Sequence, residues 1–301
     1  MKYAVIGGAG FIGNNITRLL IKENHSVKVI DNMHTGKKEN LSDIWREIEF
    51  EKVDIREIDN LEKSLKNIDG IFHQAALTSV PESYIKPEEY FEVNVNGTKN
   101  IFNIAKKMNI KVVFASSSSV YGNVNSFPIN EKVDRNPINP YGKTKLGKEK
   151  LAEDFWKENV RIIGLRYFNV YGNGQTGTYA GVITQFLKRL EKKLSPIIHG
   201  NGMQLRDFIF VEDVAKANLF AMKSDISNEF LNIGTGKTIS ILELAKIMIK
   251  LKGFDMKPIF DTELQGDVKR SQADITLTNN LIGWHSETEL IEGLKKIIKN
   301  N

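Results

Sequence analysis

Residues 2–13 read KYAVIGGAGFIG, and this stretch decides the fold class. Residues 2–6 form a short apolar run that predicts a strand, and residues 10–23 have the spacing of a helix. Between them, Gly7, Gly10 and Gly13 form the pattern G-x-x-G-x-x-G. A strand that turns this tightly into a helix needs residues without a Cβ, and the backbone can then approach a pyrophosphate at the helix N-terminus. Glycine triplets also occur in ordinary turns, but the flanking strand and helix make this one a predicted dinucleotide-binding turn.

The first half of the chain continues to alternate short β-rich runs with helical patterns. Further strands are predicted at residues 27–30, 50–53, 70–73, 111–115 and 161–167, and helices at 59–66, 87–108 and 141–157. Such alternation is typical of a parallel sheet with helices on both faces. Beyond residue 171 the pattern loosens, with predicted helices at 182–191, 212–222, 240–250 and 287–299 and a short strand at 208–210. We predict an α/β fold: a doubly wound parallel (Rossmann) sheet over residues 1–171, and a smaller C-terminal α/β substrate domain mainly over residues 172–301, with room for some segments to return to the sheet.

The composition excludes several classes of protein. The chain has 301 residues, of which 41% are hydrophobic and 26% charged, as in ordinary globular proteins. The net charge of +5 comes without a dense basic block, so we expect no nucleic-acid partner. We also expect no membrane span and no signal peptide, and therefore a cytoplasmic location. Cysteine is absent and the histidines are scattered, which excludes disulfides and thiolate nucleophiles and predicts that there is no metal site.

Asp31 closes the second predicted strand, 21 residues after Gly10. A carboxylate at this point can accept hydrogen bonds from the adenosine ribose hydroxyls, and it repels the additional phosphate of NADP. Because neither Asn32 nor Met33 is basic, the pattern favours NAD over NADP. Asp54, after the third strand, is a weaker candidate for the adenine edge. For both aspartates the alternative is a solvated or capping side chain.

Tyr141 and Lys145 are four residues apart in a predicted helix, which places them on one face, one turn apart. An ammonium near a phenol favours the phenolate, which is a competent general base for an alcohol or sugar hydroxyl. The serine run 116–119 follows a predicted strand, and ligands of parallel sheets lie at the carboxyl ends of strands. Each feature alone has an ordinary alternative, a solvated helix face or a polar loop. Together with the glycine turn and Asp31 they form a specific constellation.

The chain resembles the extended short-chain dehydrogenases/reductases, and among them the UDP-glucose/UDP-N-acetylglucosamine 4-epimerases, over nearly its whole length. The motifs that carry the resemblance are GGAGFIG at 7–13, DN at 31–32, HQAA at 73–76, NVNGT at 94–98, SSSSVYG at 116–122, PYGKTK at 140–145, LRYFN at 165–169 and RDF at 206–208. The resemblance implies a UDP-hexose 4-epimerase that oxidises the sugar transiently at C4 with tightly bound NAD. It also implies a homodimer formed through the helices at residues 87–108 and 141–157.

The resemblance assigns roles to individual residues. It implies that Tyr141, Lys145 and Ser117 are catalytic. The residues expected at the cofactor are Gly7, Gly10, Phe11, Ile12, Gly13, Asp31, Asn32, Asp54, Ile55, Gln74, Ala75, Ala76, Asn94, Ser116, Tyr141, Lys145 and Phe168. The residues expected at the UDP-sugar are Thr78, Ser117, Tyr141, Asn169, Gly181, Val182, Ile198, His199, Arg206, Asp267 and Ser271.

Two sets of positions bear on the reaction and the substrate. Related dehydratases and decarboxylases carry acids in the segment where this chain has Ser118 and Ser119, and without an acid there oxidation followed by re-reduction is favoured. Ser271 stands where relatives restricted to plain hexoses have a bulky Tyr, which leaves room for an N-acetyl group. Leu264 replaces an Arg that contacts the diphosphate in many relatives.

Other functions remain open at this stage. Lys269 and Arg270 keep a UDP-glucuronate or UDP-pentose 4-epimerase in consideration. An NAD-dependent sugar-nucleotide oxidoreductase would differ in needing external NAD for each turnover. A cofactor-sensing binding protein on the same fold is disfavoured, because Tyr141, Lys145 and Ser117 are all present.

Overall fold

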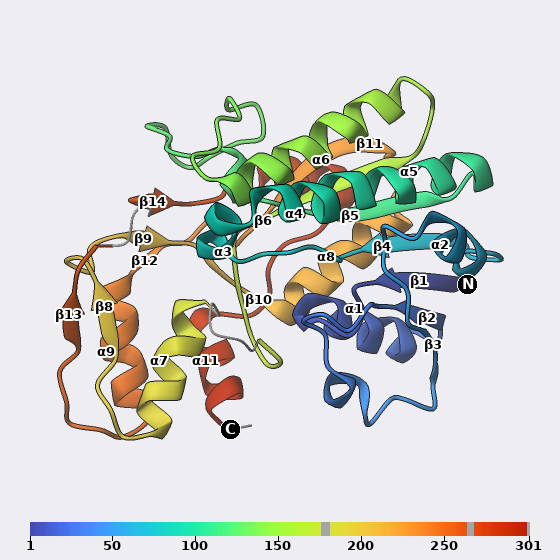
Figure 1. Ribbon diagram of the computed structural model, residues 1–301. Coiled ribbons are helices and arrows are strands. Elements are labelled where there is room, and N and C mark those ends of the chain that lie inside the picture. The colour runs from blue at the N-terminus through green and yellow to red at the C-terminus, as the bar shows by residue number, and fades with distance from the viewer. Residues whose placement is uncertain (176–180, 264–267, 300–301) are drawn as a thin grey trace.

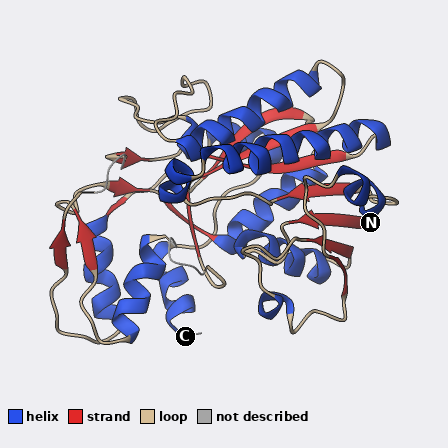
Figure 2. Ribbon diagram, viewed as in Figure 1, coloured by secondary structure: helices blue, strands red, loops and turns tan. Residues whose placement is uncertain are grey.

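A seven-stranded sheet forms the centre of the molecule (Figures 1 and 2). The computed structural model describes residues 1–175, 181–263 and 268–299. Neighbouring strands are all parallel, in the order β3-β2-β1-β4-β5-β6-β11. The strands are β1 (Lys2–Ile6), β2 (Ser26–Ile30), β3 (Ile48–Glu51), β4 (Gly70–His73), β5 (Lys111–Ser117), β6 (Ile162–Tyr167) and β11 (Asn228–Ile233). The predicted doubly wound parallel sheet is confirmed.

The strand order reverses between β1 and β4. From β1 the chain builds outward through β2 and β3, and it then returns to place β4 on the other side of β1. At such a reversal the connections after the two strands diverge, and ligands of open α/β sheets bind in the crevice at these carboxyl ends. The glycine turn follows β1 at this edge, so the fold places it where a dinucleotide would bind.

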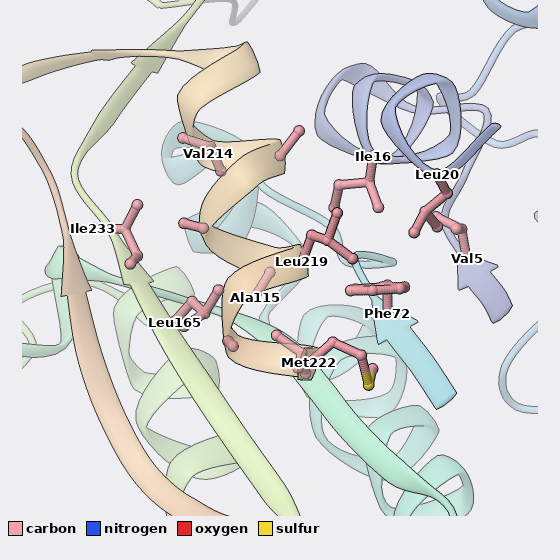
Figure 3. Packing of buried hydrophobic residues seen from close by; sticks show 14 of the residues in the cluster. Val5, Ile16, Leu20, Phe72, Ala115, Leu165, Val214, Leu219, Met222 and Ile233 are labelled. Carbon is pink, nitrogen blue, oxygen red and sulfur yellow. The ribbon is translucent and has the colours of Figure 1, made fainter. Parts of the chain in front are cut away.

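Helices α1 (Phe11–Lys22) and α8 (Val211–Lys223) cover one face of the sheet and contact each other. Ile16 and Leu20 lie one turn apart on α1 and are fully buried in a cluster with Val5 and Phe72 of the strands (Figure 3). Met222 of α8 belongs to the same cluster. Segments from both halves of the sequence therefore share one core.

The other face is covered by α2 (Ile58–Ser64), α5 (Gly97–Met108) and α6 (Pro140–Trp156). Phe102 of α5 packs edge-on against Phe114 of β5 and Phe155 of α6, with ring centroids 5.6 Å apart in both pairs. Edge-to-face pairs of this kind add to the free energy gained by burying the rings.

The single helix predicted over residues 87–108 is interrupted in the structure. After α3 (Val80–Ile85) come α4 (Pro87–Phe91), a π-helical turn over Glu92–Asn96 and then α5. The π-turn includes Asn94, whose buried side chain hydrogen-bonds to the backbone of Leu77 and to Thr144. Apolar spacing cannot distinguish a π-turn from a continuous α-helix, and π-turns occur often near functional sites.

The second half of the chain contributes to two regions. The segments α8 and β11 lie with the large sheet, although both follow residue 171. The rest forms a separate cluster around α7 (Val182–Glu191), α9 (Ile241–Leu251) and α11 (Leu290–Lys299). Short strands accompany it: β7 (Asn169–Tyr171), β8 (Ile197–His199), β9 (Leu205–Arg206), β10 (Phe208–Phe210), β12 (Ile239–Ser240), β13 (Ile259–Asp261) and β14 (Arg270–Ser271). Helix α10 (Thr276–Ile282) contacts β11.

The short strands form small sheets of their own. β9 lies between β12 and β14, β10 pairs with β7, and β13 pairs with β8. Within the described ranges, no helix is both long enough and apolar enough to cross a membrane.

Candidate active site

The glycine turn has a geometry that other residues would disturb. Gly7 has φ of +82°, in the left-handed region, and a Cβ placed on it would lie 2.6 Å from the backbone nitrogen of Ala75. A Cβ on Gly13 would lie 2.1 Å from the carbonyl oxygen of Gly7. The start of α1 thus packs directly on the turn, and the turn packs directly on the segment after β4.

The N-terminus of α1 lacks a side-chain cap. Gly10 is the capping residue and its backbone is extended, so in the described part of the chain no side chain satisfies the first amides of the helix. Phe11 and Ile12 follow, both half-buried. Free amides and the positive end of the helix dipole suit a phosphate, which is the ligand expected at this turn.

Asp31 follows β2 directly and lies beside the glycine turn. Its carboxylate accepts hydrogen bonds from the amides of Ala9 (3.0 Å) and Met33 (2.8 Å), and the residue is 7% exposed. Burial raises the pKa of Asp31, while the two amides oppose that change. The carboxylate is therefore oriented by the chain, and its remaining lone pairs are available to a ribose hydroxyl.

The other predicted adenine-side residues bond to one another. The amide of Asn32 donates to Asp54 at 2.9 Å, and the guanidinium of Arg56 donates to the same carboxylate. The Arg56 hydrogen bonds hold the pKa of Asp54 well below its usual range. Ile55 is buried against Gly97, where a Cβ would lie 2.5 Å from its side chain.

Tyr141 lies in the first turn of α6. The turn is fixed by Asn139, whose side chain caps the helix by accepting from the Gly142 amide at 2.8 Å, and by Ser83, which accepts from the Tyr141 amide at 3.1 Å. The phenol of Tyr141 lies near the Ser117 side chain at the end of β5. Burial raises the pKa of Tyr141 to about 12, and the nearby Ser117 hydroxyl opposes that rise.

Lys145 is 2% exposed and lies one turn farther along α6. Its Nζ is 5.6 Å from the centre of the Tyr141 ring and donates to the Ala115 carbonyl at 3.1 Å. Burial lowers the pKa of Lys145 to about 8, and the negative charge of Glu149 opposes that fall. Sequence reasoning therefore placed Ser117, Tyr141 and Lys145 together correctly in space. Their catalytic roles stay a prediction.

A buried ion-pair network behind this trio was not predicted. Glu149 accepts hydrogen bonds from Ser116 (2.6 Å) and from Arg166 (2.9 and 2.8 Å), and Arg135 donates to it at 3.1 Å. Glu149 follows Lys145 by four residues, so helical spacing was a signal that could have been used. Because the Ser116 hydroxyl donates to Glu149, that side chain belongs to the network and only its backbone could face a cofactor.

Some of the predicted cofactor residues after β4 use their side chains in hydrogen bonds within the chain. Gln74 donates to Asn218 at 3.1 Å and accepts from the Tyr167 hydroxyl at 3.1 Å. The Asn94 side chain donates to Leu77 and Thr144, so both of its N–H groups are used within the chain. These residues shape the crevice. Ala75 and Ala76 are half-buried there, and Phe168 is buried in another cluster, with its amide bonded to Ile233.

Two predicted substrate residues are brought side by side by the small β12-β9-β14 sheet. Ser271 pairs with Arg206 across β14 and β9, so both side chains lie on the same face of that sheet. Arg206 also borders a cavity of about 230 Å³, whose other walls include Phe208 and Lys237. Arg270, next to Ser271, points to the opposite face and stacks on Phe127, with its guanidinium 4.6 Å from the ring centre.

The remaining predicted substrate residues are more scattered. The side-chain amide of Asn169 donates to the Asp207 carbonyl at 3.0 Å. Thr78 is exposed. Gly181 is the N-terminal capping residue of α7, and Val182, which follows it, is half-buried. Ile198 is fully buried in the second-half core, whereas His199 is half-buried, and their place at the UDP-sugar stays a prediction. Asp267 and Leu264 lie outside the described residues.

Asp207 is a further residue that sequence reasoning did not single out for its own contacts. It is fully buried and accepts hydrogen bonds from the Thr235 amide (2.8 Å) and hydroxyl (2.6 Å), the Gly236 amide (2.9 Å) and the Ala273 amide (3.0 Å). It ties β9 to two distant loops. Across the described residues, no group of three or more His, Asp or Glu side chains could hold a metal ion.

Comparison with known proteins agrees with this geometry. Residues 3–234 match the NAD dependent epimerase/dehydratase family. A protein of Methanocaldococcus jannaschii provisionally named UDP-glucose 4-epimerase is 42% identical over 309 residues, covering 99% of this chain and 98% of that protein. A UDP-N-acetyl-alpha-D-glucosaminuronate decarboxylase of Bacillus cytotoxicus is 30% identical, covering 98% and 96% of the two chains.

Solved structures are equally similar. The UDP-glucose 4-epimerase of Thermotoga maritima with UDP-glucose has a TM-score of 0.95 and 35% identity, covering 99% of this chain and 98% of that one. A UDP-N-acetylglucosamine 4-epimerase from Methanobrevibacter ruminantium, in complex with UDP-N-acetylmuramic acid, has a TM-score of 0.95 and 36% identity, covering 99% and 97%. The relatives thus share the fold and differ in sugar and in reaction.

Proposed function

The chain belongs to the NAD-dependent epimerase/dehydratase family, and from that premise we propose that it is a UDP-hexose 4-epimerase. Its substrates are UDP-glucose and UDP-galactose, and also UDP-N-acetylglucosamine and UDP-N-acetylgalactosamine. The observation that carries the proposal is the arrangement of Tyr141 near Ser117 and over Lys145, with serines at positions 118 and 119.

The described residues fit NAD. The uncapped start of α1 and the Cβ-free surface of the glycine turn suit a pyrophosphate, and the oriented carboxylate of Asp31 suits ribose hydroxyls. When bound, NAD⁺ supplies a hydride acceptor for C4 of the sugar and later returns that hydride to the other face. Because the cofactor is regenerated in each cycle, we expect it to stay bound.

The proton chemistry belongs to Tyr141. With its pKa raised to about 12, the phenol is protonated in the described state. The Lys145 ammonium under the ring and the positive charge of an oxidised nicotinamide both favour the phenolate. The phenolate then takes the proton of the sugar 4-hydroxyl, assisted by the Ser117 hydroxyl, and returns it when the sugar is reduced again. Tyr141 ends the cycle as it began.

The serines at 118 and 119 favour epimerisation over elimination or decarboxylation. They occupy the turn Ser118–Val120 directly after β5, next to Ser117. A carboxyl group at this place could protonate a carbanion or remove a second proton, whereas a serine hydroxyl is far too weak an acid for either step. Without such a group, re-reduction of the 4-keto sugar is the remaining outcome.

Ser271 supports the wider substrate range. It lies beside Arg206, whose guanidinium suits a diphosphate, and its small side chain leaves space that a tyrosine would fill. Arg270 points away from that face, so it does not supply a cation for the carboxylate of UDP-glucuronate. Lys269 is exposed and keeps UDP-glucuronate or UDP-pentose as the second candidate.

We also propose a homodimer. The exposed apolar side chains Ile85 (75% exposed) and Phe91 (50%) lie on α3 and α4, next to the helices expected at the interface. A second copy would remove these side chains from water. The cytoplasmic location stays a prediction.

The test is proton NMR of the purified protein with UDP-glucose and UDP-N-acetylglucosamine separately, without added NAD. We expect the anomeric signal of the galacto product to grow with both sugars, from cofactor retained by the protein. If neither sugar reacts even after NAD is added, the proposal is wrong, and UDP-glucuronate and a UDP-pentose are tested next. Accumulation of NADH in proportion to added NAD would instead identify an oxidoreductase.

A further inference from the structure

Lys148 is a buried lysine with no role in the mechanism above. It lies on α6, three residues beyond Lys145 and seven beyond Tyr141, and is 0% exposed. Its Nζ donates to the Ala115 carbonyl at 3.3 Å and lies 5.4 Å from the centre of the Phe114 ring. Lysine is almost never fully buried without a carboxylate partner, so this position needs an explanation.

The Ala115 carbonyl also accepts from Lys145, at 3.1 Å. Both Nζ atoms lie within hydrogen-bond distance of the same oxygen. The distance between them therefore cannot exceed the sum of these two hydrogen-bond lengths. Two ammonium groups this close in an apolar interior repel each other strongly. One carbonyl oxygen cannot compensate both charges, so a single positive charge is the stable state of the pair.

Within the described part of the chain, the surrounding charges offer no second counterion. Glu149 is the carboxylate of this region, and it already accepts from Arg166, Arg135 and Ser116. Its charge still favours the protonated form of Lys145, whose pKa it raises against the effect of burial. For Lys148, burial and the neighbouring Lys145 both lower the pKa, well below its usual value. Lys145 is thus the charged member and Lys148 the neutral one.

On the β4 side, the described residues bring no negative charge to the pair. His73 is fully buried, and its Nε2 is 2.8 Å from the Thr98 hydroxyl. That hydroxyl donates to the Asn94 carbonyl at 2.6 Å, so Nε2 carries the hydrogen and Nδ1 carries a lone pair. Burial lowers the pKa of His73, and the positive charge of the lysine pair acts in the same direction, which keeps the ring neutral.

We propose that Lys148 is a positioning residue for Lys145: the two amines hold one positive charge between them at the Ala115 carbonyl, and the neutral amine of Lys148 keeps the Lys145 ammonium beneath the Tyr141 ring. The pair holds one proton beyond its two neutral amines, and this proton stays on Lys145. The effect on Tyr141 as a base rests on the proposed function. The shared charge rests on the contacts of the two lysines alone.

The neutral state of Lys148 determines the direction in which the pKa of Lys145 changes when the Lys148 amine is removed. A neutral amine beside an ammonium stabilises the charged form of Lys145, so its removal lowers the pKa of Lys145. If Lys148 were instead charged, its removal would raise the pKa of Lys145. The direction of the change therefore separates the two states.

The first experiment compares Lys148→Met with Lys148→Gln in pH profiles of kcat/KM. Met matches the length of the lysine stem and its sulfur is only a weak acceptor, whereas the Gln amide oxygen can accept from Lys145. We expect Lys148→Met to move the alkaline limb down by about one pH unit, so that activity already falls near pH 7, and Lys148→Gln to restore most of the limb. An unmoved limb in a folded Lys148→Met variant, or a limb that moves up, overturns the proposal.

A second experiment needs no substrate. Lysine labelled with ¹³C at Cε reports the charge of each amine by NMR. We expect one neutral lysine signal at pH 7 that is missing in both variants, and a Lys145 signal that titrates at lower pH in Lys148→Met. The signal of Lys111, another buried lysine with its pKa lowered to about 8, should be unchanged. Two charged signals overturn the proposal even if the protein acts on another substrate.

Discussion

The carboxyl end of the large sheet and the small β12-β9-β14 sheet carry different parts of the site, and they are held together in different ways. Ser117 and Tyr141 lie on β5, a seven-residue strand, and on α6, a helix of 17 residues, both packed into the main core. Arg206 and Ser271 lie on strands of two residues each. The groups that we propose to react with the sugar therefore lie on long elements, and those that we propose to recognise it lie on short ones.

Beside the small sheet, one carboxylate adds hydrogen bonds to the short strand ladders. Asp207 binds the amides of Thr235, Gly236 and Ala273, and thereby joins β9 to the segments after β11 and β14. Burial raises the pKa of Asp207, and these hydrogen bonds oppose the rise. Asp207 thus ties together the segments around Arg206 and Ser271, in addition to the short strand pairings.

The largest loss of turnover is expected from a change at Tyr141, at the carboxyl end of the large sheet. Tyr141→Phe removes the proton acceptor but keeps the ring, so turnover should fall by about 10²–10⁴-fold while the Tm and the bound NAD stay unchanged. Product formation by NMR, thermal unfolding and NAD released on denaturation measure the three quantities. Tyr84→Phe, in a half-exposed tyrosine on α3, is the matched control with expected wild-type turnover. Substantial turnover in Tyr141→Phe would remove the base from the mechanism.

At Asp207, beside the small β12-β9-β14 sheet, the free energy of unfolding and the affinity for the UDP-sugar should change together. Asp207→Asn turns an NH₂ group toward backbone amides and leaves them unsatisfied, so the free energy of unfolding should fall by about 2–4 kcal/mol. The KM for the UDP-sugar should rise more than kcat falls, because β9 carries Arg206 and not the base. Denaturant unfolding and steady-state kinetics test both. Asp154→Asn, at an exposed carboxylate paired with Lys157, should change neither, and a lower kcat at constant KM would contradict the contrast between the two regions.

The smallest effect concerns the choice of sugar. Ser271→Tyr should lower the ratio of N-acetylhexosamine to hexose turnover by about tenfold or more, since a bulky ring fills the space beside Arg206. Arg270→Tyr places the same side chain on the opposite face of the same strand and should leave the ratio as it is. Equal losses with both sugars in Ser271→Tyr would mean that Ser271 does not border the acetamido position.

The contrast also explains what the sequence could predict. The glycine turn, Asp31 and the Tyr141–Lys145 spacing are local patterns, so they predicted the sheet and the shared helix face of Tyr141 and Lys145, while Ser117 followed from the resemblance to the family. The two-residue strands have no periodicity, and each pairs with a strand from a distant segment. No local pattern could therefore place Ser271 beside Arg206.

The burial of charged side chains on α6 was also not predicted from the sequence. Glu149 and Lys148 have the right helical spacing from Lys145, but Lys and Glu at such positions are ordinarily on the solvent face. Burial depends on β5 and β6, which lie against that face of α6. The π-turn before α5 was missed for a similar reason, because it depends on the contacts of Asn94 and not on apolar spacing.

The position of β11 affects how the chain is made. This strand pairs with β6 along its length, and Lys111 on β5 donates to the Ala221 and Ser224 carbonyls at the end of α8. Until residues 211–233 have left the ribosome, the edge of β6 and the apolar face beneath α8 stay open to water and to other chains. The large sheet, although its central strand β1 is made early, can be completed only after residues 228–233 have been synthesised.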